Sequence, residues 1–171
     1  LLKKGYFENI WIQPAAGDAG GALGAALSTQ YEYLEGQRHV NVNAMNGSYL
    51  GPIFSQERIE EELTSAGAKF EVLEESDLLN HTAEQLAADK AIGWFQGRME
   101  FGPRALGARS IIGNPRSPEM QKVLNLKVKF RESFRPFAPS ILCEDADQWF
   151  DLQSDSPYML FVADVKAEHR I

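Results

Sequence analysis

Apolar side chains recur at helical spacing in several stretches of the chain, and the clearest of these stretches is framed at both ends. Ile59, Leu63 and Ala66 would lie on one face of a helix. Ser55 precedes them as a helix-capping residue type, and Gly67 follows as a residue type that ends helices. The pattern therefore predicts a helix between Ser55 and Gly67.

Three other helices are predicted from similar signals. The first opens at Asp18, runs towards Leu34 and stops at Gly36. A capping box of the form Thr-x-x-Gln at 82–85 predicts the start of the second. The third would begin at residue 117, where a Ser-Pro pair precedes a mainly apolar run.

Short apolar or alternating runs between these helices predict strands. The predicted strands are 10–13, 69–73, 91–95, 138–142 and 159–165. Residues 37–54 contain Asn-Gly and Gly-Pro pairs, which are typical of turns, and are expected to form a loop. Alternation of strands with helices indicates an α/β layered domain.

The length of 171 residues suits one domain of ordinary size. No apolar run approaches the ~20 residues that a membrane span requires, and the first residues lack the apolar core of a signal peptide. We therefore expect a cytoplasmic protein with no membrane partner. The chain starts without Met, so we also expect it to be part of a longer protein. The single cysteine, Cys143, cannot form an internal disulfide and is expected to be a small core residue.

Charge is distributed unevenly along the chain. The net charge is −7, yet residues 98–135 contain nine Lys or Arg against three Glu, a local balance of +6. A general nucleic-acid binder normally spreads its positive charge over a face and has a basic pI. An acidic chain with one concentrated basic block favours a compact anionic ligand, and no nucleic-acid partner is expected.

The first part of the basic block, within residues 93–110, combines arginine with glycine. Its members are Arg98, Arg104 and Arg109, with Gly97, Gly102 and Gly107 between them. Arg104 and Arg109 would point about 140° apart on a regular helix, so a helix could not present both to one ligand. Glycine permits backbone conformations in which amides bind phosphate oxygens, and the arginine fork suits bidentate phosphate contact. This segment therefore predicts anion binding.

The second part, residues 127–135, alternates cationic and apolar residues. Extended backbone would place Lys127, Lys129, Arg131 and Arg135 on one face, and Val128, Phe130 and Phe134 on the other. Pro136 disfavours a helical conformation at the residue before it, which supports extension at that end. Glu132 falls on the apolar side, so we expect either a bend there or an ion pair with a nearby arginine.

Three stretches together resemble a known family. They are GRMEFGPRALGARSI at 97–111, KFRESFRPFAPS at 129–140 and PAAGDAGGALGAAL at 14–27. The first two are similar to the C-terminal part of the NodU/CmcH-type O-carbamoyltransferases, and the third is similar to the end of that family's N-terminal, actin-like ATPase domain. The resemblance covers residues from about 10 to about 158.

The resemblance implies an α/β fold in two parts. Residues 37–171 would form a YrdC-like open twisted sheet with flanking helices, and residues 1–36 would be a strand-helix remnant of the actin-like domain. The usual His-Val-Asp-Gly-Thr-Ala-Arg stretch of the family does not follow, and most of its N-terminal domain is missing. We therefore expect that this chain alone does not complete carbamoyl transfer.

The resemblance also implies an activity and its site. The C-terminal domain would use ATP, with Mg, and carbamoyl phosphate to make carbamoyladenylate, and the N-terminal domain would pass the carbamoyl group to a hydroxyl-bearing acceptor. The residues that would hold the phosphates are Arg98, Arg104, Arg109, Lys129, Arg131 and Arg135, with Arg98 and Arg131 as catalytic residues. Asp18 would bind a divalent metal such as iron in the full-length enzyme. Adenylate formation needs positioning and charge stabilisation, so no protein nucleophile is required.

Simpler roles are weighed beside these. Asp18 could be only a helix cap, Arg104 could brace its loop, and Glu100 is expected to pair with and orient an arginine. Arg116 and Lys122 are expected to be solvated charges at helix ends. The isolated histidines, His39, His81 and His169, are expected to be surface or cap residues. Two rival classes also stay open, a non-catalytic RNA- or nucleotide-binding α/β domain with phenylalanines that stack on bases, and a domain whose arginines pair only with its own acidic residues.

Overall fold

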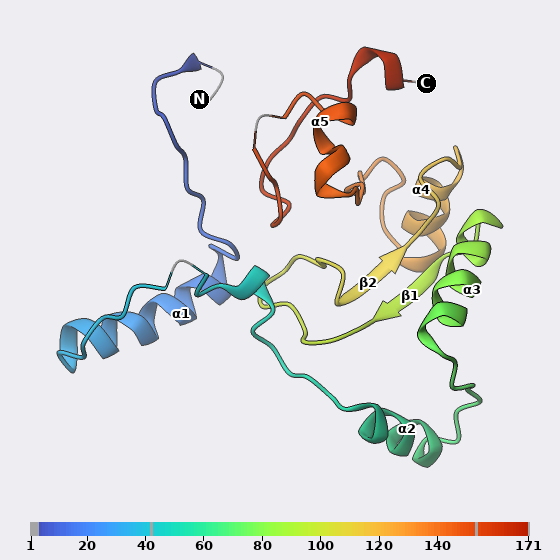
Figure 1. Cartoon of the computed structure of the whole chain (residues 1–171), viewed down its shortest axis with the longest axis horizontal. Helices are drawn as coiled ribbons and strands as arrows, with labels where there is room; N and C mark the ends of the chain where they lie inside the picture. The colour runs from blue at the N-terminus through green and yellow to red at the C-terminus, as the bar shows by residue number, and fades with distance from the viewer. Residues whose placement is uncertain (1–3, 42, 153, 171) are drawn as a thin grey trace.

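The computed structural model describes residues 4–41, 43–152 and 154–170, and Figure 1 shows their arrangement. The helices are α1 Asp18–Ser28, α2 Gln56–Ser65, α3 Glu75–Ala87, α4 Met120–Val123 and α5 Ala146–Trp149. The strands are β1 Ile92–Phe95 and β2 Arg109–Ile112. π-Helical turns at Thr29–Tyr33 and Leu124–Val128 extend α1 and α4. Short 3-10 turns lie at Asn46–Ser48, Cys143–Asp145 and Ala167–His169.

Helix α1 begins where the sequence predicts, but Asp18 does not cap it. Gly17 occupies the N-cap position, and no side chain bonds the free amides there. Asp18 is the first helical residue, where its charge is favourable to the helix dipole. Its side chain is exposed and bonds no free amide of the helix, so the prediction that Asp18 caps the helix is wrong.

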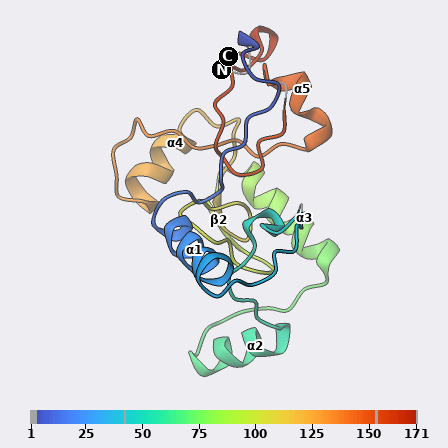
Figure 2. The same ribbon diagram turned by 90° about the vertical axis from the view of Figure 1, so that its left-hand side faces the viewer.

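The predicted start and end of α2 are confirmed. The Ser55 hydroxyl accepts a hydrogen bond from the backbone amide of Arg58 at 3.3 Å, and the helix ends before Gly67. Arg58 also forms ion pairs with Glu61, at 3.7 Å, and with Glu62 on the helix surface. Figures 1 and 2 show α2 at the edge of the molecule, away from the sheet.

The predicted capping box at 82–85 is wrong, because α3 begins seven residues earlier. Thr82 lies inside the helix, and its hydroxyl donates to the backbone oxygen of Leu78 at 2.7 Å. A threonine hydroxyl can bond a carbonyl of the preceding helical turn, so it does not have to mark a helix start.

The sheet is antiparallel and two-stranded in the part of the chain that the structure describes. Ile92 pairs with Ile112 and Phe95 with Arg109. The predicted strand 91–95 is confirmed, whereas β2 was not predicted. The runs 10–13, 69–73 and 138–142 are not strands, and 159–165 contributes only a bridge from Val165 to Phe150. The α/β class is confirmed, while the YrdC-like and actin-like architectures stay predictions.

Few apolar residues are buried in the part of the chain that the structure describes. Met120 and Leu124 are buried in α4 and its π-helical extension, Ala108 is buried directly before β2, and Pro14 is buried before α1. Gly113 lies between β2 and α4, and a Cβ there would come within 2.7 Å of Met120 Cγ and 3.1 Å of Leu124 Cδ1. A glycine at this position therefore lets the helix pack closely against the end of the strand.

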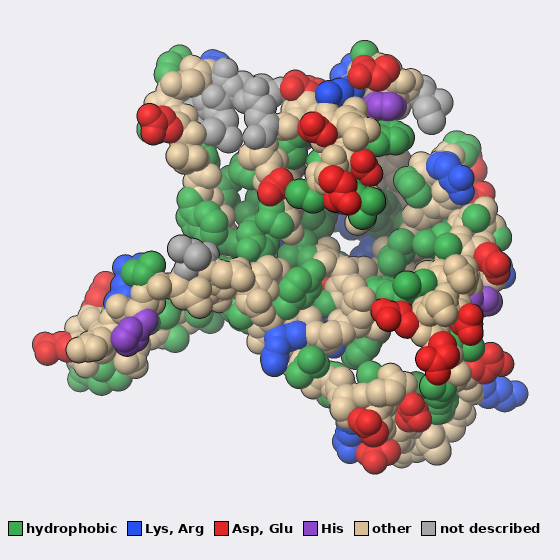
Figure 3. Space-filling view, viewed as in Figure 1, with side chains coloured by type: hydrophobic (Ala, Val, Ile, Leu, Met, Phe, Trp, Pro, Cys, Tyr) green, Lys and Arg blue, Asp and Glu red, His purple; other side chains and the backbone are tan. Residues whose placement is uncertain are grey.

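Outside this small core the molecule is open. The accessible surface is 13677 Å², whereas a compact protein of this mass would expose about 8,400 Å². Figure 3 shows apolar side chains across the face in view and the arm formed by α1. Cys143 is exposed rather than buried, so the expectation that it is a core residue is wrong. No helix among the described residues is both long and apolar enough to cross a bilayer.

Candidate anion-binding loops

The cationic residues singled out in the sequence lie mainly in two loops. The first basic loop, residues 96–109, connects β1 to the first residue of β2. The second basic loop, residues 129–137, follows the π-helical turn Leu124–Val128. Each loop is organised by one buried polar side chain.

Glu100 organises the first basic loop. The residue is 6% exposed, and its Oε1 accepts hydrogen bonds from the backbone amides of Leu106 at 2.7 Å, Ala108 at 2.7 Å and Arg109 at 3.2 Å. The expectation that Glu100 pairs with an arginine is therefore wrong, since its carboxylate binds backbone amides instead. Burial by itself raises the pKa of Glu100, but hydrogen bonds from these three amides and from its own amide outweigh it and lower the pKa below its ordinary value.

The backbone amides at 106–109 are all used within the protein. Three donate to Glu100, and the amide of Gly107 donates to Ser110 Oγ at 2.9 Å. Gly107 has the positive φ that the sequence led us to expect, 104°. These amides are nevertheless not available to a ligand, so phosphate contacts in this part of the loop would come from side chains.

Arg109 braces the start of β2 against the end of β1. Its Cζ lies 3.4 Å from the centroid of the Phe95 ring. Its Nη1 donates to the backbone oxygens of Gln96 at 2.9 Å and Ala108 at 2.8 Å, and its Nη2 donates to that of Gly97 at 3.2 Å. Most of the guanidinium donors are therefore engaged within the chain.

Arg98 and Arg104 differ from Arg109 in their engagement. Arg98 Nη1 donates to the backbone oxygen of Gly51 at 2.6 Å, which leaves its other donors open. No hydrogen bond or ion pair holds the Arg104 side chain among the described residues, so it does not brace the loop. Arg104 borders a cavity of about 10 Å³, too small for a phosphate.

Residues 48–52, which the sequence predicted only as loop, form hydrogen bonds to the first basic loop. The Tyr49 hydroxyl donates to the backbone oxygen of Leu106 at 2.6 Å. The amide of Phe101 donates to the backbone oxygen of Ser48 at 2.6 Å, and the amide of Gly51 donates to that of Met99 at 2.9 Å. Residues 48–52 therefore hold the first basic loop through hydrogen bonds to its backbone.

Asn125 organises the second basic loop. It is 0% exposed, and its Nδ2 donates to the backbone oxygens of Ser133 at 3.1 Å and Arg135 at 2.8 Å. Its Oδ1 accepts from Arg131 Nε at 2.6 Å, and its backbone oxygen accepts from the amide of Arg131 at 2.9 Å. The Arg131 guanidinium also lies over the Phe137 ring, 4.9 Å from its centroid. These bonds fold the loop back onto the π-helical turn that extends α4.

The predicted extended ridge over 127–135 is therefore wrong. Residues up to Val128 are still helical, and Phe130 has a φ of 50°, so side chains do not alternate between two faces. Glu132 and Arg135 form the expected ion pair, with 2.9 Å between Oε2 and Nε. Its own backbone amide, and then the charge of Arg135, lower the pKa of Glu132. Lys129 is exposed, and no bond holds its side chain among the described residues.

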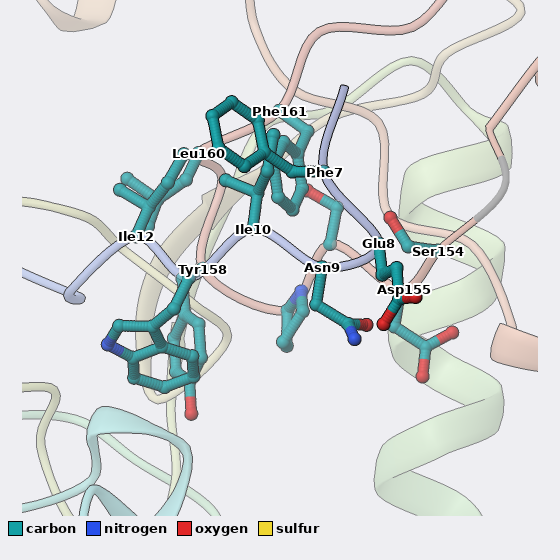
Figure 4. Close-up of a pocket in the computed structure, with 13 residues that line it drawn as sticks. Phe7, Glu8, Asn9, Ile10, Ile12, Ser154, Asp155, Tyr158, Leu160 and Phe161 are labelled. Carbon is teal, nitrogen blue, oxygen red and sulfur yellow. The ribbon is translucent and has the colours of Figure 1, made fainter. Parts of the chain in front are cut away.

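The structure joins the two loops through β2 and α4 rather than through their cations. No hydrogen bond, ion pair or ring contact connects a cation of one loop to the other loop among the described residues. A shared pocket for all six predicted phosphate-binding residues stays a prediction. The large cavity of about 420 Å³ lies elsewhere, between residues 7–12 and 154–161, and neither Lys nor Arg lines it (Figure 4).

The predicted metal ligand, Asp18, has no partners for that role here. Within the described ranges, His, Cys, Asp and Glu do not gather in groups of three or more that could hold a metal ion. Asp18 alone does not fit a metal site, and its role as a ligand stays a prediction.

Glu100 and Asn125 were missed as organising residues, although the sequence contains a signal for each. Glu100 is an acidic residue within an arginine- and glycine-rich loop, and Asn125 stands between Leu124 and Leu126 in a largely apolar helical run. A polar residue inside an apolar run is often buried with its hydrogen bonds satisfied.

Comparison with known proteins shows which family the chain matches. The family model described as "Carbamoyltransferase C-terminus" matches residues 83–171, which contain both basic loops, and the model described as "Carbamoyltransferase N-terminus" matches residues 1–27. An uncharacterized protein of Synechocystis sp. is 58% identical over 174 residues, which cover 100% of this chain and 28% of that protein. Nodulation protein NolNO of Sinorhizobium fredii is 42% identical, covering 99% of this chain and 25% of that protein.

A relative with a named reaction is more distant. The 3'-hydroxymethylcephem-O-carbamoyltransferase of Streptomyces clavuligerus is 32% identical over 166 residues, which cover 96% of this chain and 29% of the enzyme. The chain thus spans less than a third of the length of each of these relatives. Because the C-terminal family model matches more than half of its residues, the chain belongs to the carbamoyltransferase family.

Proposed function

We propose that this chain contributes the ATP and carbamoyl phosphate site of an O-carbamoyltransferase, which makes carbamoyladenylate and passes the carbamoyl group to a hydroxyl-bearing acceptor. The observation that carries the proposal is the match of the C-terminal carbamoyltransferase model to 83–171, the range that contains both basic loops. The name of the Streptomyces clavuligerus relative describes carbamoyl transfer to oxygen, which supports a hydroxyl acceptor.

The chemistry suits a site of fixed cations. For the reaction to balance, water must take the phosphoryl group of carbamoyl phosphate, which releases phosphate and carbamate. An oxygen of the carbamate then bonds to the α-phosphorus of ATP as pyrophosphate leaves. Negative charge spreads over phosphate oxygens in such steps, and positioned arginines and lysines stabilise it. Mg would accompany ATP as the counter-ion of its phosphates.

The contacts divide the six predicted phosphate-binding residues into two groups. Arg104 and Lys129 have side chains without a partner among the described residues, so they are best placed to take up an anion. Arg98 and Arg131 each spend one side-chain nitrogen on the protein and keep other donors for the proposed catalytic role. Arg109 and Arg135 are engaged in a brace and an ion pair, so we propose mainly indirect roles for them.

The remaining parts of the proposal concern the longer protein. Residues 1–36 would belong to an actin-like transfer domain and 37–171 to a YrdC-like domain, with the protein located in the cytoplasm, where ATP is available. Asp18 would bind a divalent metal such as iron only with ligands from outside the described residues. The RNA-binding alternative has no support from the comparisons.

The test uses the protein at its full natural length. We expect calorimetric titration to show binding of ATP with Mg and of carbamoyl phosphate, and radioactive pyrophosphate to exchange into ATP only when carbamoyl phosphate is present. Arg104→Ala and Lys129→Ala should each weaken binding of one substrate by about tenfold or more, the usual effect of losing a hydrogen bond to a charged group.

Lys122→Ala provides the matched control. It removes one positive charge from the same basic block, but Lys122 lies on α4 outside both loops. Substrate affinity should stay within about twofold of wild type if its only effect is screened surface charge. Absence of binding of both substrates to the wild-type protein would refute the proposal.

A further inference from the structure

We propose that Glu100 is a positioning residue of the first basic loop. Its carboxylate acts as a built-in anion that fills a nest of backbone amides, and it thereby holds Arg104 and Arg109 in place before any substrate arrives. The identity of the substrates rests on the proposed function, whereas the nest itself rests only on the geometry.

The amides converge on a single carboxylate oxygen. Leu106 and Ala108 donate to Oε1 from 2.7 Å and Arg109 donates from 3.2 Å, and the carboxylate is almost completely buried. Successive backbone amides that point into one concavity form a recognised anion-binding arrangement. Here the anion belongs to the protein.

The backbone amides of residues 106–109 all have acceptors within the protein, so the loop needs no ligand to satisfy them. The amide of Gly107, which lies between the bonded residues, donates to Ser110 Oγ, so no amide from 106 to 109 is left unpaired. Without Glu100, three amides would lose their hydrogen-bond acceptor. Leaving such groups without an acceptor in a buried place costs their full desolvation free energy. The loop would then open to hydrate them.

The nest is directly connected to the arginines. The amide of Arg109 is one of the three donors, and the Arg109 side chain lies over Phe95 and bonds the backbone oxygens of Gln96 and Gly97. Residues 96 and 97 directly precede Arg98. Arg104 lies in the segment that is closed into a ring by the hydrogen bond from the Leu106 amide to Glu100 Oε1. A shift of the nest would therefore displace all three arginines.

A role for Glu100 as general acid or base is disfavoured by the same contacts. Hydrogen bonds from amides stabilise the ionised form, so the group has no proton to give near neutral pH. Its burial also keeps it from a substrate in the loop. Positioning is the role that remains.

The decisive variant is Glu100→Ala, studied in the full-length protein by hydrogen exchange with mass spectrometry. It removes an acetate-sized group from the nest, so we expect amides within 101–110 to exchange at least about tenfold faster. Sodium acetate should restore much of the protection, because it returns a carboxylate to the nest. Acetamide, which has the same shape without the charge, should restore little, and sodium chloride keeps ionic strength equal in all samples.

Substrate binding provides the second readout. Glu100→Ala should weaken binding of ATP or carbamoyl phosphate, and acetate should recover part of the affinity, which a general loss of folding would not show. Glu100→Gln keeps one acceptor oxygen and should fall between wild type and Glu100→Ala. Glu119→Ala is the matched control, because its side chain caps nothing at the start of α4, and it should match wild type in both readouts.

The two proposals fail in different ways. Unchanged exchange at 101–110 in Glu100→Ala, or faster exchange that acetate does not slow, would overturn the role of Glu100. Rescue of exchange by acetate in a protein that binds neither substrate would uphold the nest and refute the proposed function.

Discussion

At the scale of single residues, ionisation of Glu100 should couple loop stability to pH. The pKa of Glu100 in the folded protein lies below its ordinary value of 4.5, so the unfolded chain takes up the proton first as pH falls. The stabilisation is therefore fully present above about pH 4.5 and is lost as pH falls through the folded pKa. Glu100→Gln should be less stable than wild type at pH 7, with a smaller further loss in acid. Urea unfolding followed by circular dichroism from pH 3 to 7 measures both, and parallel pH profiles for the two proteins would contradict the expectation.

The other organising residue, Asn125, gives a matching expectation for the second basic loop. Asn125→Ala removes the bonds to the backbone oxygens of Ser133 and Arg135 and to Arg131 Nε, and among the described residues only the oxygen of Arg135 keeps a second donor, Gln121 Nε2 at 3.1 Å. We therefore expect a loss of about 1–3 kcal/mol in the free energy of unfolding. Asn80→Ala on the exposed surface of α3 is the control, and it should be neutral or slightly stabilising because alanine favours helix. Equal losses in both variants would show that the buried amide does not organise the loop.

At the scale of elements, the junction of β2 with α4 depends on Gly113. A methyl group there would press against Met120 and Leu124, so Gly113→Ala should destabilise the protein by about 1–3 kcal/mol, as overpacking does. Gly93→Ala in β1 provides the comparison, because no atom lies within 4 Å of the added Cβ. Thermal unfolding of both variants measures the difference, and a Gly113→Ala melting temperature equal to that of Gly93→Ala would contradict the close packing.

Elements with local signals could be predicted, and elements that depend on distant partners could not. The cap and stop of α2 lie next to the helix that they define, so Ser55 and Gly67 sufficed. β2 begins with an arginine inside a glycine-rich stretch and exists because it pairs with β1. The position of the basic residues along the chain could be read in the same way from composition, whereas their role in binding phosphate stays a prediction. What holds them, Glu100 and Asn125, depends on burial and on bonds to the backbone of other turns, which no local pattern displays.

At the scale of the whole molecule, the exposed surface exceeds that of a compact protein of this mass by about 5,000 Å². Trp11 is 71% exposed and Phe130 is 83% exposed. We expect a polypeptide of these 171 residues to bind the apolar dye ANS in native buffer and to associate as its concentration rises. Phe130→Ser with Phe134→Ser should lower the dye signal. If the polypeptide stays monomeric at high concentration and does not increase ANS fluorescence, this expectation is contradicted.

The location of the core sets the order in which the molecule opens. Met120 and Leu124 are buried in α4 and its π-helical extension and Ala108 is buried directly before β2, whereas α1 and α2 contain no buried residue. Regions with little apolar burial fluctuate open at low free energy, and those around the core open last. The chain should therefore unfold in cooperative stages, with α1 and α2 first. The hairpin of β1 and β2 should be the last segment that a protease cleaves.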